Sequence, residues 1–259
     1  DNLTSNMEQA KEMMRALIPL RIRWVTQSAI NVAYDEEALS LMKRSGCQGV
    51  LVGFESLDSL TLRQMNKDFN LMKGGPAEAM RNFRKHGLRI YGTFIFGYDH
   101  DTPATFRQAL DFAKSEGLFI AAFNHITPFP GTPLYTRMKQ EGRLLFDPWW
   151  NDDRYRYNMI PFQPAQMSAE ELADRCVAAR REFYCWSSIL RRATHRVNFR
   201  DPWMLLNFLV INAMHQRDVE GRNGLPLGDQ NWQGQLIKAH RVTSVDALLR
   251  NEISGPVSV

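Results

Sequence analysis

Strand-like apolar segments alternate with helix-like amphipathic segments through residues 1–135, and this alternation constrains the fold more than any other feature. The strand signals lie at residues 22–26, 49–54, 89–96 and 119–126. Strands that alternate with helices of this length indicate a parallel sheet with right-handed crossover connections. The strand segments read as apolar on both faces, as buried parallel strands do. A barrel and an open doubly wound sheet both fit this pattern.

Capping and termination signals give the limits of the intervening helices. Asp35 is expected to be an N-cap residue, since two glutamates follow it in the first turn. Gly117 is expected to end the last helix of this half, because glycine commonly follows a helix C-terminus. The four helices are predicted at residues 5–17, 35–46, 76–87 and 102–117.

Residues 136–259 have a different character and form the second predicted region, an aromatic-rich connection with a helical C-terminal extension. Ser168, with glutamate three residues later, is a capping box that opens one long helix to about residue 196. A second helix is expected at residues 202–220, behind an aspartate and a proline. The tail is Gly-, Asn- and Gln-rich at first, with a short helical turn expected near Val245–Arg250.

Polar residues follow each predicted strand at its carboxyl end. They are Gln27 and Ser28, Glu55 and Ser56, Asp99, and the segment 124–127. The carboxyl ends of parallel strands form the ligand-binding edge in α/β folds. The binding site is therefore expected at this edge of the sheet.

Cysteine content and charge narrow the class of protein. Cys47, Cys176 and Cys185 are too far apart for a disulfide scaffold or a CxxC metal site, and scattered thiols of this kind are typical of the reducing cytoplasm. All three are expected to be buried thiols. The formal charge of +4 does not by itself indicate a nucleic-acid partner, and none is expected.

Targeting signals are not evident in the sequence. The longest apolar stretch, Trp203–Met214, is too short for a bilayer span, and no signal-peptide pattern occurs. The first residue is Asp1 and not methionine, so the chain is expected to be a fragment, a processed protein or a trimmed one.

Four segments together resemble the radical S-adenosylmethionine (SAM) family, in particular its cobalamin-associated branch. They are GFESLDSLTLRQMNKDFN at 53–70, GTFIFGYDHDTPATF at 92–106, FNHITPFPGTPLY at 123–135, and the opening Asp1–Leu3. Each motif alone is weak, but their order and spacing agree as well. The resemblance is strong over residues 1–135 and weaker over 136–200.

The resemblance implies the fold class and the missing parts. The family has a partial parallel (β/α) barrel of six strands, and this chain corresponds to the last four, with Asp1–Leu3 at the end of an earlier strand. The CxxxCxxC segment that holds the 4Fe–4S cluster follows the first strand of the family and would lie outside this chain. Cluster ligands must be thiolates. The fragment alone is therefore expected to be inactive, neither assembling the cluster nor cleaving SAM.

The resemblance also assigns residues to SAM. Glu55 matches the acidic residue that binds the ribose hydroxyls, because a carboxylate accepts hydrogen bonds from two vicinal hydroxyls. The segment GTFIFGYD resembles the family pattern GxIxGxxE, which assigns Gly92, Phe94, Gly97 and Asp99 to the cofactor site, Phe94 against adenine. Asp99 stands where the family has glutamate, which leaves its role open. The alternative is a packed strand, in which Glu55 only faces a helix start and Gly97 only turns the chain.

Other residues are assigned to the same site with less support from the motif. Asn124, Thr127 and Pro128 would lie beside the adenine, where backbone groups read its edge. Lys67 would pair with the SAM carboxylate, or else lie on a solvated helix. Gln27 is expected to face the same pocket.

Two histidine-containing motifs are not interpreted as catalytic or metal sites. His125 near a strand end is interpreted as a structural residue. The run Asp99–Asp101 resembles a metal site only superficially, since successive residues of a turn rarely converge on one ion, and Asp101 or Thr102 is placed to cap the next helix.

The implied parent enzyme uses SAM and the cluster to generate a 5′-deoxyadenosyl radical. Its substrate would be a small molecule such as a lipid, a tetrapyrrole or another natural product, and its reductant a ferredoxin or flavodoxin. Cobalamin is an inference about a domain outside this chain; with it, methyl transfer or ring formation is the expected reaction. The segment Pro148–Tyr157 either covers the pocket mouth or packs against the barrel.

Two alternative interpretations assign the chain to other functional classes. A degenerate, non-catalytic relative would bind RNA or a membrane surface through an arginine-rich helix. Its arginines are Arg175, Arg180, Arg181, Arg191, Arg192, Arg196 and Arg200, with Glu182 as the one acid among them. An ordinary α/β-barrel enzyme with a phosphate site lacks support, because the sequence has no glycine-rich phosphate loop.

Overall fold

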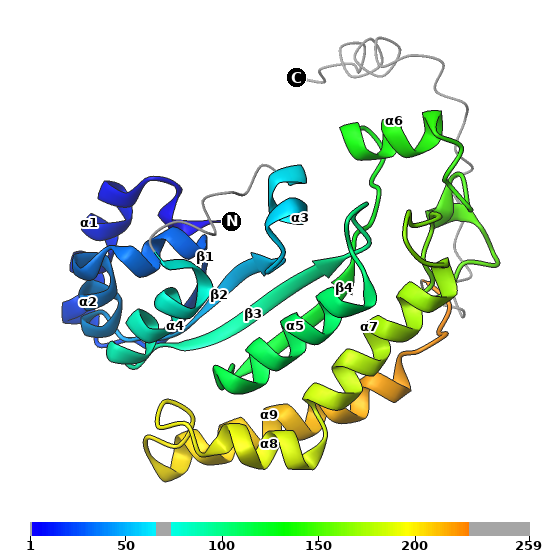
Figure 1. Cartoon of the computed structure of the whole chain (residues 1–259). Coiled ribbons are helices and arrows are strands. Elements are labelled where there is room, and N and C mark those ends of the chain that lie inside the picture. Colours follow the sequence, from blue (N-terminus) through cyan, green and yellow to red (C-terminus); the bar gives the residue numbers. More distant parts are fainter. Residues whose placement is uncertain (1, 66–73, 228–259) are drawn as a thin grey trace, which may run out of the picture. The chain divides into compact units, whose positions relative to one another are not determined.

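The structure is a computed structural model that describes residues 2–65 and 74–227 (Figure 1). Residues Asp1–Leu227 form one compact unit, and a second unit, Gly228–Val259, lies outside the described residues. The predicted helical turn near Val245–Arg250 and the candidate Lys67 also lie outside them. The predicted domain boundary after residue 135 stays a prediction.

Within the described residues the sheet has four parallel strands in sequential order, as Figure 1 shows. They are β1 (Trp24–Ser28), β2 (Cys47–Glu55), β3 (Arg89–Phe96) and β4 (Ile120–His125). Right-handed crossovers between consecutive neighbours all run over the same face of a sheet. A doubly wound sheet needs a reversal of strand order, so the order excludes it. The predicted fold class, a parallel α/β sheet of the partial-barrel type, is confirmed.

Most helices of the described residues lie where the sequence predicts them, and the structure differs from the prediction in four places. They are α1 (Met7–Leu17), α2 (Glu36–Arg44), α3 (Ser59–Gln64), α4 (Gly75–Lys85), α5 (Pro103–Ser115), α6 (Pro133–Gln140), α7 (Ala169–Phe183), α8 (Trp186–Ala193) and α9 (Pro202–Gly221). The short α3 and α6 were not expected. The one long helix predicted after Ser168 is wrong, because the chain breaks between α7 and α8. Leu3–Ser5 is a 3₁₀ turn and not the end of a strand.

Side-chain caps explain why several helices start where they do. The Asp35 carboxylate accepts a hydrogen bond from the Ala38 amide at 2.9 Å, and the Ser168 hydroxyl accepts one from the Glu171 amide at 3.0 Å. Asp201 caps α9 in the same way. Each cap satisfies an amide that has no partner inside its helix. All three were predicted from the sequence.

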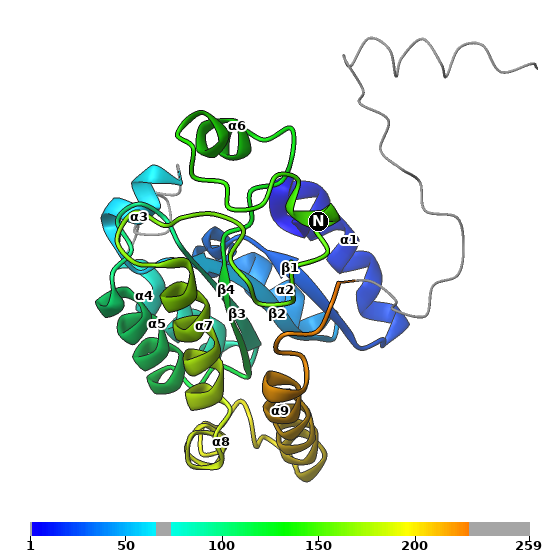
Figure 2. The same ribbon diagram turned by 90° about the vertical axis from the view of Figure 1, so that its right-hand side faces the viewer.

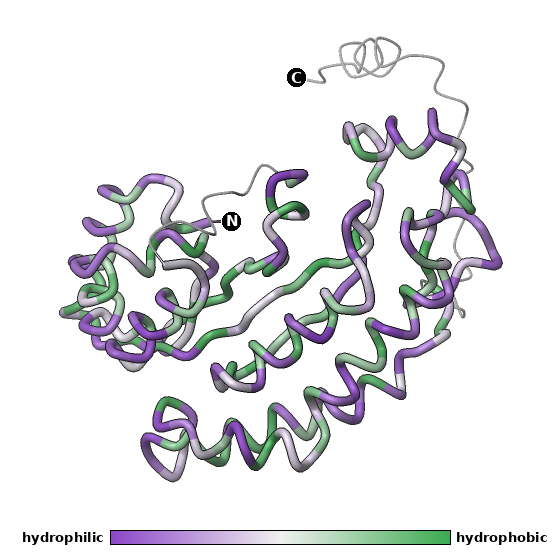
Figure 3. Tube along the Cα trace, viewed as in Figure 1, coloured by the Kyte–Doolittle hydropathy of each residue, from purple (hydrophilic) through white to green (hydrophobic). Residues whose placement is uncertain are grey.

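One face of the sheet is packed with aromatic rings. Phe94 stacks between Phe54 and Phe123, with ring centroids 5.6 and 5.4 Å away. Phe96 stacks on Phe106 of α5 at 4.0 Å. In Figure 3 hydrophobic and hydrophilic segments alternate along α5 and α7, as expected for helices with one buried side.

The opposite face of the sheet is less covered, which differs from the expectation of strands buried on both faces. Burial alternates strictly along β3, with every second residue only partly buried. Arg89, Tyr91, Thr93 and Ile95 occupy these positions. We call this side, with its counterparts on β1, β2 and β4, the open face of the sheet.

The two outer strands have different surroundings. Side chains from the C-terminal half lie along β4, where the Tyr184 hydroxyl donates to the Ala121 carbonyl at 2.8 Å and accepts from its amide at 3.2 Å. Figure 2 shows β4 with α7 and α9 nearby. On β1 the Val25 side chain is 75% exposed, and no described strand pairs with its outer side. Among the helices of the described ranges, none has both the length and the apolarity needed to cross a bilayer.

Candidate functional site

Glu55 ends β2 in an unusual backbone conformation. Its φ is +63°, in the left-handed region that non-glycine residues rarely adopt, and the β2–β3 register shifts between Gly53 and Glu55. A Cβ on Gly53 would lie 2.4 Å from Glu55 Oε1 and 3.7 Å from Thr93 Oγ1. The carboxylate therefore folds back over Gly53, on the open face. The predicted position at the carboxyl end of the strand is what the structure has.

Tyr98 adds a hydroxyl near the same carboxylate. Burial, together with the negative charges of Glu55 and Asp101, raises the pKa of Tyr98 to about 12. The hydroxyl therefore stays protonated at neutral pH. Tyr98 was not singled out from the sequence, although it lies inside the GTFIFGYD segment.

Asp101 organises the turn that follows β3. The carboxylate, in a residue only 1% exposed, accepts hydrogen bonds from the Gly97 and Tyr98 amides at 2.8 and 3.0 Å and from the Thr61 hydroxyl at 3.1 Å. Burial raises the pKa of Asp101 to about 6, against the effect of these hydrogen bonds. Of the two residues expected to cap the next helix, Asp101 and Thr102, it is Thr102 that occupies the cap position. Asp101 is thus a positioning residue that sequence reasoning missed.

Gly97 has two reasons to be glycine in this turn. Its φ is +106°, and a Cβ would lie 2.9 Å from Leu172 and 3.0 Å from Phe162. A side chain there would meet both strain and collision. The turn itself, and not a bound ligand, is enough to require this residue.

Asp99 is held by basic side chains and does not join the Asp101 cluster. Its carboxylate accepts from Arg137 and Gln64 at 2.6 Å and from Arg143 at 2.8 Å. Burial by itself raises the pKa of Asp99, but the hydrogen bonds from Arg143, Arg137 and Gln64 outweigh burial, so the pKa is lowered. Asp99 therefore ties the loop after β3 to α3, α6 and the segment after α6, and its role toward SAM stays a prediction.

Gly92 and Phe94 face the helices and lie on the opposite side of the sheet from Glu55. Phe94 has no exposed surface. A Cβ on Gly92 would lie 2.6 Å from Leu118 and 3.0 Å from Phe54. The structure gives both residues a packing role, and the expected stacking of Phe94 on adenine finds no accessible ring surface.

The segment after β4 divides between the open face and the interior. Asn124 is exposed and lines a hollow of about 240 Å³ with Tyr157 and Arg180. Thr127 is partly buried, and Pro128 is buried, with its carbonyl accepting from the Trp149 indole at 3.0 Å.

The titration of His125 agrees with a structural role. Burial, together with the charge of Arg180, lowers the pKa of His125 to about 4. The imidazole is therefore neutral at physiological pH. The segment that holds Trp149, expected either to cover a pocket or to pack, packs against the Pro128 backbone at this point.

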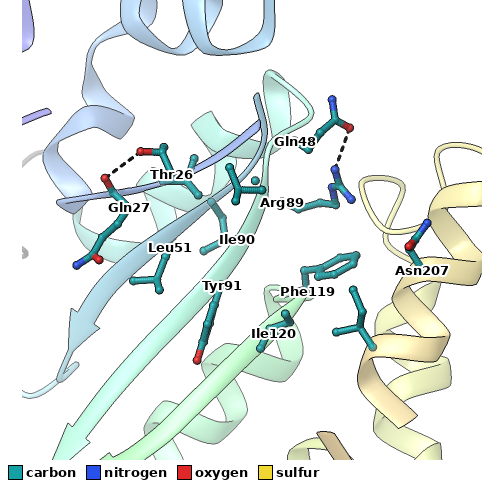
Figure 4. Close-up of a pocket in the computed structure, with 14 residues that line it drawn as sticks. Thr26, Gln27, Gln48, Leu51, Arg89, Ile90, Tyr91, Phe119, Ile120 and Asn207 are labelled. Atoms are coloured by element: carbon teal, nitrogen blue, oxygen red, sulfur yellow. Dashed lines mark hydrogen bonds between the residues drawn. The ribbon is translucent and has the colours of Figure 1, made fainter. Parts of the chain in front are cut away.

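Gln27 lines a larger cavity of about 530 Å³ on the open face (Figure 4). Of the predicted cofactor residues within the described ranges, it is the one that lines this cavity. The other lining residues come from the amino-terminal halves of the strands and from α9, including Leu51, Tyr91, Ile120 and Asn207. The cavity therefore does not coincide with the carboxyl edge around Glu55.

The arginine-rich segment is not a free basic surface. Arg192 is fully buried, Arg175 pairs with Glu171 at 2.7 Å, and Arg181 pairs with Glu220 at 2.7 Å. Glu182 binds Arg107 and Lys114, which lie outside that segment. Arg175, Arg181 and Arg192 are therefore engaged within the chain, and nothing in the described residues supports the RNA- or membrane-binding alternative.

The three cysteines lie in separate places. Cys47 is on β2 and Cys176 on α7, and burial raises their pKa values to about 11 and 12. Cys185, just before α8, is only partly buried, so the expectation that all three thiols are buried is wrong for this one. Over residues 2–65 and 74–227, no group of three His, Cys, Asp or Glu side chains is placed to hold a metal ion.

Comparison with protein families and with curated proteins finds relatives that are named as methyltransferase or methylase. Residues 132–205 match a family model described as a domain of unknown function (DUF4070). The chain is 34% identical to bacteriochlorophyllide d C-12(1)-methyltransferase of Chlorobaculum tepidum, over 74% of this chain and 41% of that protein. It is 28% identical to the hopanoid C-2 methylase of Rhodopseudomonas palustris, over 57% and 29%.

A cyclase and a solved structure complete the comparison. The anaerobic magnesium-protoporphyrin IX monomethyl ester cyclase of Cereibacter sphaeroides is 23% identical over 77% of this chain and 32% of its own length. The methyltransferase TsrM of Kitasatospora setae, solved with cobalamin and a 4Fe–4S cluster, matches 54% of this chain and 27% of its own at 20% identity, with a TM-score of 0.46. The chain spans less than half the length of the curated relatives it matches.

Proposed function

We propose that this chain, which is related to the methyltransferases and cyclases of the radical SAM family, is the C-terminal part of such an enzyme and binds SAM at the carboxyl edge of its sheet. Glu55 is the residue we assign to the ribose hydroxyls of SAM. Gly97, Asp99, Asn124, Thr127 and Pro128 surround the same edge and complete the proposed site.

The conformation of Glu55 is the observation that supports this proposal. A left-handed backbone costs a non-glycine residue roughly 1–3 kcal/mol and is concentrated at functional sites. Gly53 leaves the space that the folded-back carboxylate occupies. The result is a carboxylate fixed on the open face, where two vicinal hydroxyls of a ribose can donate to it.

The cysteines of this chain do not fit an iron–sulfur cluster. Cys47 and Cys176 are buried thiols on different elements, and three or four converging thiolates would be needed. We therefore assign the cluster to residues outside this chain. When bound there, a 4Fe–4S cluster would supply the electron for reductive cleavage of SAM, with an external reductant such as ferredoxin or flavodoxin as its source.

The role left to this chain is to bind and orient. Glu55 would hold the ribose, and the turn fixed by Asp101 would shape the adjacent wall. We propose methyl transfer or ring formation on a small molecule, a tetrapyrrole or a lipid, since the relatives include enzymes named for bacteriochlorophyllide, hopanoid and magnesium-protoporphyrin chemistry. Cobalamin belongs to the same proposal and would bind outside this chain.

Calorimetric titration of the chain with SAM tests the binding site. Glu55→Gln keeps the size of the side chain but removes its charge, and a charged hydrogen-bond acceptor contributes about 1.5–3 kcal/mol. We expect the Kd for SAM to rise about tenfold to a hundredfold. Glu12→Gln, a change at an exposed glutamate of α1, is the matched control and should leave the Kd unchanged. Equal Kd values for wild type and Glu55→Gln would refute the assignment of Glu55.

Cluster assembly gives a separate test. After reconstitution with iron and sulfide under anaerobic conditions, we expect the chain alone to produce no 5′-deoxyadenosine from SAM. Production of 5′-deoxyadenosine would show that the cluster ligands lie within this chain, and would overturn that part of the proposal without affecting the SAM-binding result.

A further inference from the structure

The 530 Å³ cavity on the open face lies at the other end of the sheet from the proposed SAM site. Its lining on β2 begins at Gln48 and Gly49. This lining ends at Leu51, and at about 3.3 Å per residue Glu55 lies roughly 13 Å farther along the same strand. A molecule in this cavity would therefore occupy a second site. Its volume is in the range of small-molecule pockets.

Most of the cavity wall is apolar. Leu51, Tyr91, Ile120 and Phe119 come from the strands and the turn before β4, and Ile211 comes from α9. Figure 4 shows the labelled strand side chains and Phe119 gathered around the cavity, with Asn207 on the helix opposite. An apolar surface of this kind is stabilised by covering it with an apolar ligand.

Arg89 places a positive charge at one end of this apolar wall. Its guanidinium donates to Gln48 Oε1 at 3.0 Å, contacts the Met204 sulfur, and lies 5.2 Å from the centre of the Phe119 ring. Burial, together with the nearby charge of Arg200, lowers the pKa of Arg89 to about 10. The guanidinium is charged at neutral pH in spite of this burial.

Arg89 is partly buried and forms no ion pair with any acidic side chain of the described ranges, although charges withdrawn from water in proteins are usually paired. Asp201 is the acidic residue whose charge acts on it, but the Asp201 carboxylate accepts from the Met204 amide at 2.8 Å and lies 3.6 Å from Arg200. The guanidinium instead contacts neutral partners, the amide oxygen of Gln48 and the sulfur of Met204. An anionic ligand would supply the missing charge.

We infer that this cavity binds an amphipathic carboxylate, with its apolar chain against Leu51, Tyr91 and Ile120 and its carboxylate on Arg89. Arginine suits this role because its planar donors match the two oxygens of a carboxylate. The apolar wall and the single cation together favour this class over a neutral apolar molecule or a polar anion. The inference goes beyond the proposed function, since binding here needs neither SAM nor a cluster.

Paired titrations with decanoate and decanol test the inference, because the two probes share a chain and differ in the charged head. We expect wild type to bind decanoate at least about tenfold more tightly than decanol, as hydrogen bonds to a charged group predict. Arg89→Met should remove this preference and leave decanol binding in place. Arg191→Met, at an exposed arginine that does not line the cavity, should keep the preference.

Leu51→Trp fills the cavity and provides a second, independent variant. We expect it to bind neither probe, while decanoate raises the thermal unfolding temperature of wild type but not of this variant. Equal affinity of wild type for decanoate and decanol would overturn the role of Arg89. Unchanged decanoate binding by Leu51→Trp would place the ligand elsewhere and overturn the site.

Discussion

The two outer strands of the sheet, β1 and β4, differ in what contacts the backbone groups on their outer edges. An outer strand presents backbone amides and carbonyls that no further strand pairs with. On β4 the Tyr184 hydroxyl binds both the amide and the carbonyl of Ala121. Arg192 and Asn212 bind the Leu118 and Phe119 carbonyls in the turn just before the strand. On β1 no described helix does the same, and Val25 is left exposed.

The difference shows where the C-terminal half acts on the sheet. Residues distant in the chain also bind the turn that leads into β4: the Asn212 amide donates to the Phe119 carbonyl at 3.1 Å, and the Asn198 amide to the Gly117 carbonyl at 3.0 Å. We call this set of contacts, with those of Tyr184 and Arg192, the β4 seal. Shielding by the C-terminal helices thus applies to β4 and leaves β1 open.

The largest effect is expected when Arg192 is removed from the β4 seal. Its guanidinium donates to the Leu118 and Phe183 carbonyls at 2.9 Å and to Asn212 at 3.0 Å, with no exposed surface. Arg192→Met should lower the free energy of unfolding by about 3–5 kcal/mol, since buried acceptors lose their donor. Urea denaturation measures the loss.

Arg191→Met on the same helix is the control for this variant. Arg191 is exposed, so its replacement should change the free energy of unfolding by no more than about 0.5 kcal/mol. Similar losses for the two variants would show that the helix needs positive charge in general, and that the buried contacts of Arg192 are unimportant.

Tyr184→Phe should have the next largest effect. The variant keeps the ring but removes the hydroxyl that serves both the amide and the carbonyl of Ala121. We expect a loss of about 1–3 kcal/mol and faster hydrogen exchange of the Ala121 amide. Tyr157→Phe, at a more exposed tyrosine, should change neither quantity. Unchanged exchange at Ala121 in Tyr184→Phe would mean that the hydroxyl does not protect the strand edge.

Lowering the pH should weaken the β4 seal through His215, which stacks on Tyr184 with ring centroids 5.0 Å apart. Burial lowers the pKa of His215 below its ordinary value of 6.5. The unfolded chain therefore binds more protons, and this stabilisation is complete above pH 6.5 and is lost as the pH falls below it. Urea denaturation from pH 8 to 5 should show this loss, and His215→Gln should reduce it. A steeper loss in the variant would contradict the assignment.

The smallest change in stability is expected at the open strand. Val25→Lys should alter the free energy of unfolding by less than about 0.5 kcal/mol, because the side chain is 75% exposed. A charge on an outer strand opposes edge-to-edge pairing. Light scattering at rising protein concentration should show less self-association. Leu190→Lys, at an exposed leucine of α8, should leave self-association unchanged. An equal reduction in this variant would mean that exposed apolar surface, and not the strand edge, causes the self-association.

Local patterns predicted most of the parallel sheet. The limits of β3 agree to the residue, and the caps of α2 and α9 lie at the expected aspartates. These features depend on residues within a few positions of one another. The break between α7 and α8 was missed because Tyr184 turns toward Ala121, a partner 63 residues away in the chain.

In the candidate site, too, the features that depend on local sequence were predicted, and those that depend on distant contacts were not. Glu55 was placed at the correct strand end, since the end of an apolar run is a local signal. Its left-handed backbone, and the facing of Phe94 toward α5, depend on the strand register and on packing with distant helices. Arg89 was missed because an arginine at the start of a strand is expected to be exposed to solvent. Its burial depends on contacts with the sheet, Phe119 and Met204, which the local sequence does not predict.

The folded-back carboxylate of Glu55 ties the evolution of two positions together. A Cβ on Gly53 would lie 2.4 Å from Glu55 Oε1, so a larger residue at position 53 would displace the carboxylate from its folded-back position. Among homologous sequences, a larger residue at position 53 should be accompanied by a moved or shortened side chain at position 55. Glycine would be retained there as long as the acid is, and the pair would be lost together in lineages that no longer need it.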